Sequence, residues 1–256
     1  MAAHPDLVPD PALSRDEMEE LQRKIRTRAT FDDDDSIEPT MLANPSAAID
    51  SDEAPVVAGV DQAFLDDRAV SAVVAMRDGQ IVERSHAVTP LEIPYIPGFL
   101  SFREGRPILE AVEAVSIDPD LYLFDGSGRI HFREAGIATH MGVVLDVPAI
   151  GVAKRLLCGT AVADLEDLPA GTRVPIEADS RVDAPNGTLL GYAVQTKQYD
   201  SPNRHVNPLY VSPGHRIGAE TAADVVLALS TEYKLPEPVR LADAYASEVK
   251  NEYSVE

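Results

Sequence analysis

Two aspartates stand in segments whose other residues are almost all apolar. Asp61 follows VVAGV and Asp125 follows LYLF, and both segments have the composition of buried β-strands. A carboxylate that is desolvated without a partner would protonate or destabilise the fold, so its charge has to be matched. The simplest shared explanation is a bound cation. Ligand sets made only of oxygen favour Mg²⁺ or Mn²⁺ over Zn²⁺, and such an ion suits phosphodiester hydrolysis because it neutralises charge on the phosphate.

A third carboxylate, Glu104, lies close to a predicted helix start. Proline is favoured at the first helical position, so Pro107 and the following ILEAVEAV predict a helix over about 105–116 with Glu104 at its mouth. From there Glu104 could join the two aspartates as a third ligand. Ser101 and Glu104 also fit a capping box, in which the glutamate would only satisfy a backbone N–H.

Two basic residues are candidates for handling a phosphate or the attacking water. His215 lies in SPGH after the strand-like LYVS, and Lys154 follows the strand-like VPAIGVA. Each has a simpler interpretation, His215 as an ordinary loop histidine and Lys154 as a solvated surface residue. Asp125 could likewise only shape the turn at Gly126, and Asp61 could face solvent at a strand end. The prediction of a site depends on these residues together, because a single short pattern is weak.

A rigid tyrosine loop precedes Glu104 in the stretch LEIPYIPGF. Pro94 and Pro97 fix their own φ and push the residue before each toward extended geometry, so Tyr95 is expected on a stiff loop. A stiff, exposed aromatic ring can press against or insert into a binding partner. The simpler alternative is that Tyr95 is an amphipathic core residue whose hydroxyl reaches water.

The composition is that of a globular protein. The chain has 256 residues and 45% hydrophobic content, which supports a real core. A single cysteine, Cys158, allows no disulfide within a monomer and favours a reducing cytosol, so we expect a cytoplasmic protein. The sequence shows no signal-length apolar segment at its N-terminus and no run long enough to cross a bilayer, so we expect no membrane partner.

The charge is strongly negative. The 43 acidic residues outnumber the 22 basic ones, 17 of which are arginine, and the net charge is -21. Such a surface should repel nucleic acid. The other interpretation is adaptation to a salty cytoplasm, because at about 1 M salt the Debye length falls to roughly 3 Å and repulsion becomes short-ranged. The acidity therefore makes a nucleic-acid partner less expected without ruling it out.

The sequence divides into a domain and an N-terminal extension. We expect residues 1–12 to be disordered, 13–29 to form a helix whose apolar face docks on the domain, 30–54 to be an acidic linker containing Asp32 to Asp35, and 55–250 to form the domain.

Within the domain, the pattern alternates between strands and helices. Strands are predicted at 55–64, 68–78 and 80–88 as an antiparallel meander, then at 121–126 and 147–153, with helices at about 105–116 and 134–145 between them. Further on, we expect a polar loop over 160–180, a strand at 188–197, a surface loop over 200–208 and two closing helices. This order predicts an α/β fold with a ribonuclease H-like mixed sheet, flanked by helices, in which the strands carrying Asp61 and Asp125 are neighbours.

Several stretches then identify a family. The sequence resembles endonuclease V, the deoxyinosine 3′ endonuclease family, and the matching stretches occur in family order. They are VAGVD ending at Asp61, PYIPGFLSFREG (94–105), PDLYLFDGSGRIHFREAGIATHMG (119–142), PAIGVAK (148–154), YVSPGHRI (210–217) and the terminal PEPVRLADAYASE.

The resemblance implies roles for particular residues. It implies that the metal-binding carboxylates are Asp61, Glu104 and Asp125, that the fourth active-site residue is His215, and that Lys154 lies near the scissile phosphate. It implies that Tyr95 enters the duplex beside an everted base, on the loop of Pro94, Ile96, Pro97 and Gly98. Other positions expected close to the site are Asp120, Gly126, His131, Gly136 and His140, with a base pocket lined by backbone near Gly126 and Gly136 to Ala138.

The resemblance also implies an activity. A family member would be a monomeric DNA repair enzyme that uses Mg²⁺, or Mn²⁺ in its place, to cut the second phosphodiester bond 3′ to deoxyinosine. The target base must be flipped out of the stack, and a stiff tyrosine could fill the vacated space, since base stacking on an aromatic ring contributes about 1–3 kcal/mol. At high salt we expect binding to depend more on this ring and the pocket than on surface charge.

Three alternatives stay open from sequence. An inosine-specific endoribonuclease would differ in tolerating or requiring a 2′-hydroxyl. A non-catalytic inosine-binding protein would have no need of three carboxylates. A ribonuclease H-like interaction domain without chemistry would gain no stability from divalent metal.

Overall fold

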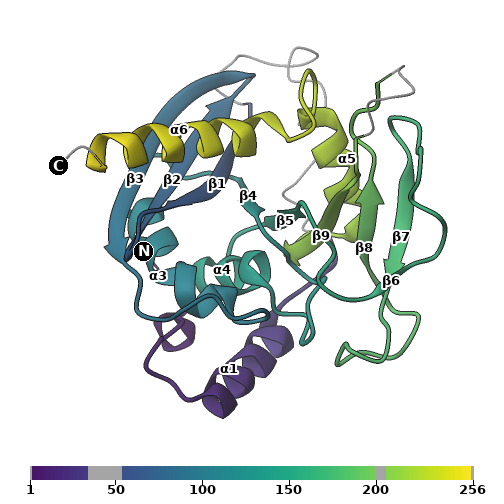
Figure 1. Ribbon diagram of the computed structural model, residues 1–256, viewed down its shortest axis with the longest axis horizontal. Coiled ribbons are helices and arrows are strands. Elements are labelled where there is room, and N and C mark those ends of the chain that lie inside the picture. The colour runs from purple at the N-terminus through teal and green to yellow at the C-terminus, as the bar shows by residue number, and fades with distance from the viewer. Residues whose placement is uncertain (1, 34–53, 200–205, 255–256) are drawn as a thin grey trace.

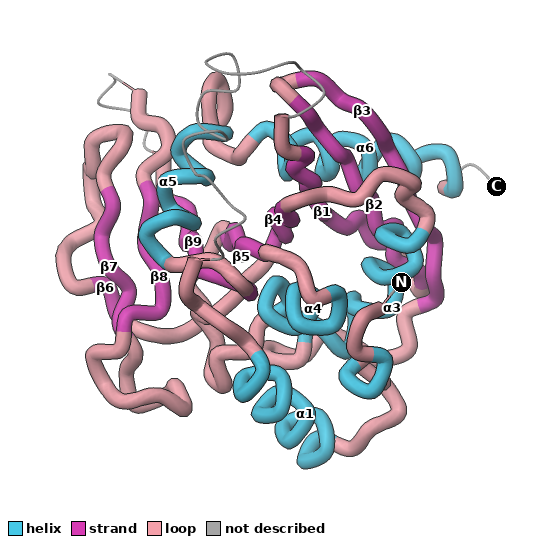
Figure 2. The backbone as a smooth tube through the Cα atoms, turned by 180° about the vertical axis from the view of Figure 1, so that it is seen from behind, coloured by secondary structure: helices cyan, strands magenta, loops and turns pink. Residues whose placement is uncertain are grey.

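The computed structural model describes residues 2–33, 54–199 and 206–254. Within these ranges nine strands form one mixed sheet with helices on both faces, as Figures 1 and 2 show. The strand order is β3-β2-β1-β4-β5-β9-β8-β7-β6. No helix in the described ranges is long and apolar enough to cross a membrane.

The first five strands form the part of the sheet that the sequence predicts. They are β1 Val56–Phe64, β2 Arg68–Arg77, β3 Gln80–Pro90, β4 Leu121–Asp125 and β5 Ala149–Ala153. The meander β1-β2-β3 is antiparallel, whereas β4 and β5 run parallel to β1. This arrangement confirms the ribonuclease H-like α/β fold.

The remaining strands extend the sheet beyond β5. They are β9 Leu209–His215, β8 Leu189–Val194, β7 Arg173–Glu177 and β6 Thr160–Ala161, all paired antiparallel. The polar loop predicted over 160–180 is therefore wrong where β6 and β7 lie. The reason is that β7 is short and contains Pro175, which argues against a strand in sequence, yet Val174 and Ile176 are buried in a side cluster with Ile130.

The helices are α1 Arg15–Arg28, α3 Leu100–Glu113, α4 Ile137–Leu145, α5 Ala219–Leu229 and α6 Glu237–Tyr253. The helix predicted over 105–116 begins earlier, at Leu100, so Glu104 lies inside its first turns rather than at its mouth. Phe99 is the N-cap and has no side-chain cap bond, so Ser101 and Glu104 do not form a capping box. Pro107 lies within α3, so the helix start that this proline predicts is wrong.

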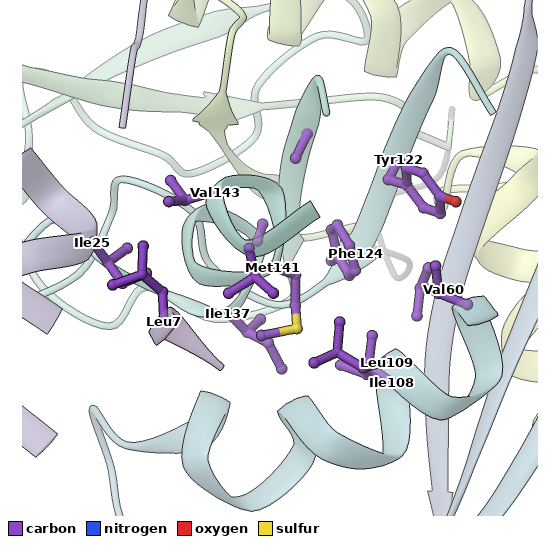
Figure 3. Close-up of a cluster of buried hydrophobic side chains, with 14 of the residues drawn as sticks. Leu7, Ile25, Val60, Ile108, Leu109, Tyr122, Phe124, Ile137, Met141 and Val143 are labelled. Carbon is purple, nitrogen blue, oxygen red and sulfur yellow. The ribbon is translucent and has the colours of Figure 1, made fainter. Parts of the chain in front are cut away.

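Two hydrophobic clusters hold the helices to the sheet. The larger lies between the sheet and α1, α3 and α4, and Figure 3 shows Ile25, Met141 and Phe124 directed into it. The other packs α5 and α6 on the opposite side, with Val225 and Val239 among its members.

The N-terminal segment joins the first cluster, which corrects the expectation of disorder for residues 2–12. Leu7 is only 2% exposed and shares the cluster with Ile25 of α1. The His4 N–H donates to the Val144 carbonyl at 3.0 Å, and the His140 ring donates through Nε2 to the Leu7 carbonyl at 2.9 Å. The segment is ordered by burial of one leucine and by bonds to α4, which composition alone does not reveal.

Parts of three predicted segments lie outside the described residues, namely Met1 of the N-terminal segment, 34–53 of the acidic linker and 200–205 of the surface loop. The described start of the predicted linker, residues 30–33, packs against the domain. The Gly218 N–H at the beginning of α5 donates to Asp33 Oδ1 at 2.8 Å, so this acidic residue caps a helix.

The contact between His140 and Leu7 predicts a pH dependence of stability. Burial lowers the pKa of His140 from 6.5 to about 4. The unfolded chain therefore takes up a proton more readily as pH falls from about 6.5 toward 4, and stability declines over that window. His140→Gln can still donate to Leu7 but cannot titrate. We expect its free energy of unfolding to fall by about 2–3 kcal/mol less than that of the wild type between pH 7 and 4.5, measured by urea denaturation; identical losses would contradict the assignment.

Candidate active site

The three predicted carboxylates lie around one pocket of about 700 Å³. The last paired residues of β1 and β4 are Val60 and Phe124, so Asp61 and Asp125 come next to each other on parallel neighbouring strands. Glu104 reaches the same pocket from α3. The strand register and one helix thus bring together side chains that are far apart in sequence.

Asp61 and Glu104 are strongly desolvated. Asp61 is 5% exposed, its Oδ1 accepts the Gln62 N–H at 2.7 Å, and its buried Oδ2 has no hydrogen-bond partner among the described residues. Burial, and then the charge of Asp125, raise the pKa of Asp61 to about 9. Burial raises the pKa of Glu104 to about 8, and Asp125 adds to the rise although Arg103 opposes it.

This pocket fits a divalent cation. A desolvated carboxylate with an orphaned oxygen lacks a positive partner, and the donor set is made only of oxygen, as Mg²⁺ and Mn²⁺ prefer. Within the described ranges, no three His, Cys, Asp or Glu side chains already stand close enough to form a metal cluster. That arrangement is compatible with Mg²⁺, which keeps several waters and is commonly bound through one or two carboxylates.

Lys154 supplies positive charge at the edge of the site. Its Nζ donates to Asp125 Oδ2 at 2.7 Å, and the side chain is 48% exposed. Partial burial opposes the charged form, but the charges of Asp125 and Asp61 outweigh it and raise the pKa of Lys154. Lys154 therefore stays cationic beside the carboxylates and is accessible to an anion.

A further carboxylate, Asp243 of α6, acts on this site and was not predicted. Its charge raises the pKa values of both Asp61 and Lys154. The N-terminal end of α6 crosses β1 so closely that a Cβ on Gly59 would lie 2.1 Å from the Pro238 carbonyl carbon. Asp243 lies in the family-like stretch PEPVRLADAYASE, which was the available signal, but only the three-dimensional structure shows that its charge acts on Asp61 and Lys154.

His215 is not brought to this pocket, contrary to the prediction. β9 runs antiparallel to β5 and pairs His215 with Ala149, at the start of β5, whereas Asp125 pairs with Val152 near its end. His215 Nδ1 accepts the Thr30 N–H at 3.2 Å, and its Nε2 lies 3.3 Å from Asp146 Oδ1. His215 thus anchors the segment after α1 at the opposite end of the central strands from the pocket.

Two more predicted positions lie away from the pocket. Asp120 precedes β4, where its carboxylate accepts the Val56 N–H at 2.8 Å, so it joins the starts of two strands. His140 is fully buried, and its ring packs edge-on against Phe102 in addition to bonding Leu7. Both residues support the fold around the site.

The tyrosine loop forms the rim of the pocket. Tyr95 is 63% exposed and Ile96 is 41% exposed, and Pro94 and Pro97 are exposed beside them. Gly98 is buried at a φ of +82°, in a turn that the Phe99 N–H closes by donating to the Ile96 carbonyl at 3.0 Å. Tyr95 is therefore not a core residue; its ring stands in solvent over the site.

The inner wall of the pocket comes from the loop between β4 and α4. Gly126, His131 and Gly136 line it, together with Ser127 and Ala135. Gln22 of α1 also lines it, and sequence reasoning missed this residue because it lies in the N-terminal extension. The pocket thus combines acidic side chains with a wall of small residues.

The fold and the carboxylates around one pocket point to the class of metal-dependent nucleases. A sequence profile of endonuclease V matches residues 42–244, and endonuclease V from Haloarcula marismortui is 57% identical over 260 residues, covering 96% of each chain. The chain belongs to the endonuclease V family, a family of DNA repair nucleases.

Solved structures agree with this placement. The crystal structure of endonuclease V from Streptomyces avermitilis has a TM-score of 0.77 at 30% identity and covers 98% of each chain. Endonuclease V from Ciona intestinalis, in complex with a 24mer DNA containing an inosine followed by a ribo-adenosine, has a TM-score of 0.69 at 25% identity, covering 93% of this chain and 98% of that one.

The orphaned oxygen of Asp61 predicts how stability responds to metal. Asp61→Asn removes a desolvated carboxylate, so we expect the metal-free variant to melt about 2–4 °C higher than the wild type. MgCl₂ or MnCl₂ at about 100 times its Kd should stabilise the wild type by about 2.7 kcal/mol and the variant by little, as measured by scanning calorimetry. The matched control, Asp66→Asn on the exposed turn after β1, should keep the full gain. A full gain in Asp61→Asn would contradict metal binding at this residue.

Proposed function

We propose that this protein is a DNA repair endonuclease that recognises deoxyinosine and hydrolyses the second phosphodiester bond 3′ to it, leaving 5′-phosphate and 3′-hydroxyl ends. The observation that carries the proposal is that one pocket combines desolvated carboxylates with a rigid, exposed tyrosine at its rim. Phosphodiester chemistry uses the first feature, and extraction of a base from a duplex uses the second.

Asp61, Glu104 and Asp125 would hold Mg²⁺, or Mn²⁺ in its place, and the charge of Asp243 acts on Asp61. When bound, the cation supplies a Lewis acid for the scissile phosphate. The carboxylates orient it, and their burial keeps the site in a low-dielectric environment in which charges act strongly. Lys154, which is cationic and half-exposed, would bind a phosphate oxygen and so help place the scissile bond.

Base recognition would use the part of the pocket that is lined by small residues. A flipped base leaves a gap in the stack, and the exposed ring of Tyr95 is placed to fill it. The everted base would lie against Gly126 and Gly136, where small residues allow the backbone to approach its edge. Inosine pairs less well than guanine, so flipping costs less there, which is one source of selectivity.

An inosine-specific endoribonuclease is the second candidate. The observation that favours it is the nucleic acid bound to the Ciona relative, in which a ribonucleotide follows the inosine. A site of this class that accepts a 2′-hydroxyl after the lesion would cut RNA as well. A non-catalytic inosine-binding role fits less well, because a binder has no use for three carboxylates in one pocket.

We also propose a setting for this activity. The protein would act as a monomer in a salty cytoplasm, where screening makes its net charge of -21 compatible with binding a polyanion. Its similarity to the Haloarcula marismortui protein supports salt adaptation.

The reaction is tested on an end-labelled duplex with one deoxyinosine, in MgCl₂ with 0.5–3 M KCl. We expect a single nick at the second phosphodiester 3′ to the lesion, and a rate reduced more than about 100-fold in Asp125→Asn, whereas Asp66→Asn cuts normally. An RNA copy of the substrate runs in parallel. Cleavage of the RNA alone would replace the DNA proposal with the endoribonuclease, and binding without cleavage of either would leave only the inosine-binding role.

The role of Tyr95 is tested by comparing duplex with single-stranded substrate. Only a duplex leaves a gap to be filled, so Tyr95→Ala should weaken binding to an inosine duplex by about 5- to 150-fold, the equivalent of about 1–3 kcal/mol. Binding to single-stranded inosine DNA should change little. Tyr95→Phe retains the ring and should bind as the wild type does. Equal losses on both substrates would show that Tyr95 contacts the strand rather than replacing the base.

A further inference from the structure

α1 packs two different faces against the rest of the protein. Its apolar face points into the large cluster through Met18, Leu21 and Ile25. A second, polar stripe consists of Arg15, Glu19, Gln22 and Arg26, spaced four, three and four residues apart so that they share one side of the helix. This stripe contacts the two loops that form the pocket, and Figures 1 and 2 show α1 next to α4.

Gln22 connects those two loops directly. Its side chain is 1% exposed, its Nε2 donates to the Gly98 carbonyl at 2.7 Å, and its Oε1 accepts from Arg133 Nε at 2.7 Å. Gly98 belongs to the tyrosine loop, and Arg133 belongs to the loop between β4 and α4. One amide group therefore spans from the rim of the pocket to its inner wall.

The Gly98 carbonyl receives a second donor from that inner loop. His131 Nε2 lies 3.0 Å from the Gly98 oxygen, and His131 Nδ1 accepts the Arg133 N–H at 3.2 Å. These partners fix the tautomer with its proton on Nε2. Two donors on one carbonyl hold the peptide plane that follows Gly98, and with it the turn from Ile96 to Phe99 that carries Tyr95.

An independent ion pair ties α1 to the inner loop. Glu134 is 3% exposed and accepts from Arg26 of α1 at 2.6 Å and from Arg129 at 2.7 Å. Both guanidinium groups also stack on the ring of Phe31, at 4.9 and 4.6 Å from its centre. Since this pair anchors α1 without Gln22, loss of the Gln22 amide should leave the helix docked.

We propose that Gln22 is a positioning residue for base recognition, which holds the tyrosine loop at a fixed distance from the inner wall of the pocket. The inference rests on the proposed function and deepens it, because it assigns part of the recognition geometry to α1, outside the 42–244 region that matches the family profile. Gln22 acts through the Gly98 carbonyl rather than on the reacting atoms. Its loss should therefore affect substrate binding more than the chemical step.

Gln22→Glu separates the two hydrogen bonds of the Gln22 side chain, the one to the Gly98 carbonyl and the one from Arg133. The carboxylate still accepts from Arg133, now with charge assistance, but it cannot donate to the Gly98 carbonyl and repels it. We expect the KM for an inosine duplex to rise about tenfold with kcat within about twofold, because a buried carbonyl has lost a donor. Hydrogen exchange of the Phe99 amide in the free protein should accelerate at the same time. Gln22→Met, which loses both hydrogen bonds, should raise KM at least as much.

Leu21→Ala is the matched control. It removes core packing from the neighbouring position of α1 while leaving the Gln22 amide intact, so it should lower Tm yet keep wild-type KM and wild-type exchange at Phe99. Wild-type exchange at Phe99 in Gln22→Glu would overturn the connection. Faster exchange with unchanged KM, or a loss confined to kcat, would overturn the recognition role. If the wild type cut no inosine substrate, the proposed function would fail and the recognition role with it, whereas the exchange experiment would still decide whether Gln22 holds the loop.

Discussion

Asp61 and Asp125 lie at adjacent positions on the neighbouring parallel strands β1 and β4, and the electrostatic cost of placing two carboxylates there governs the rest of the site. Two carboxylates close together in a desolvated place cannot both ionise without positive charge nearby. The high pKa of Asp61, about 9, expresses this cost. Lys154 reduces it from one side through its 2.7 Å contact with Asp125. Asp243 increases it from the other, and the net demand for a cation is what makes the pocket suited to divalent metal.

The same acidity that prepares the site for metal is unfavourable for a polyanionic substrate. With a net charge of -21 the surface offers little general attraction to DNA. High salt removes the long-range repulsion but also weakens counterion release, which is the usual source of nucleic-acid affinity. Short-range contacts are less affected, because stacking and hydrogen bonding do not depend on the Debye length. The geometry of the tyrosine loop and pocket therefore has to supply affinity that a basic surface would otherwise give.

The sequence could predict those features that depend on local pattern and strand order. Apolar strands with single aspartates predicted β1, β4 and the adjacency of Asp61 and Asp125, and paired prolines predicted a stiff Tyr95. What it could not predict depends on the tertiary arrangement. His215 and Asp243 both lie in family-like stretches, but antiparallel β9 carries His215 to the opposite end of the strands from the pocket, whereas α6 crosses β1 and its Asp243 acts electrostatically on Asp61.

The prediction of disorder for the N-terminal residues is wrong for a related reason. Residues 2–12 have only two large aliphatic side chains, Leu7 and Val8, and their order comes from burial of Leu7 and from bonds to α4. The composition of a segment indicates how much apolar surface it could bury by itself. It does not indicate which contacts a neighbouring part of the protein provides. The helix start at Leu100 differs from the prediction because Pro107 favours the first turn of a helix in sequence, although a proline can be accommodated later in a helix whose packing is favourable.

The stiffness of the tyrosine loop shows how local and tertiary constraints combine. Proline restricts its own φ and biases the residue before it, but it leaves its own ψ and the following glycine free. Gly98, at a φ of +82°, is the most permissive residue of the loop. The donors from Gln22 and His131 converge on the carbonyl of this residue. Rigidity at Tyr95 therefore needs both the two prolines and an external clamp on Gly98, and half of that clamp comes from a helix in the N-terminal extension.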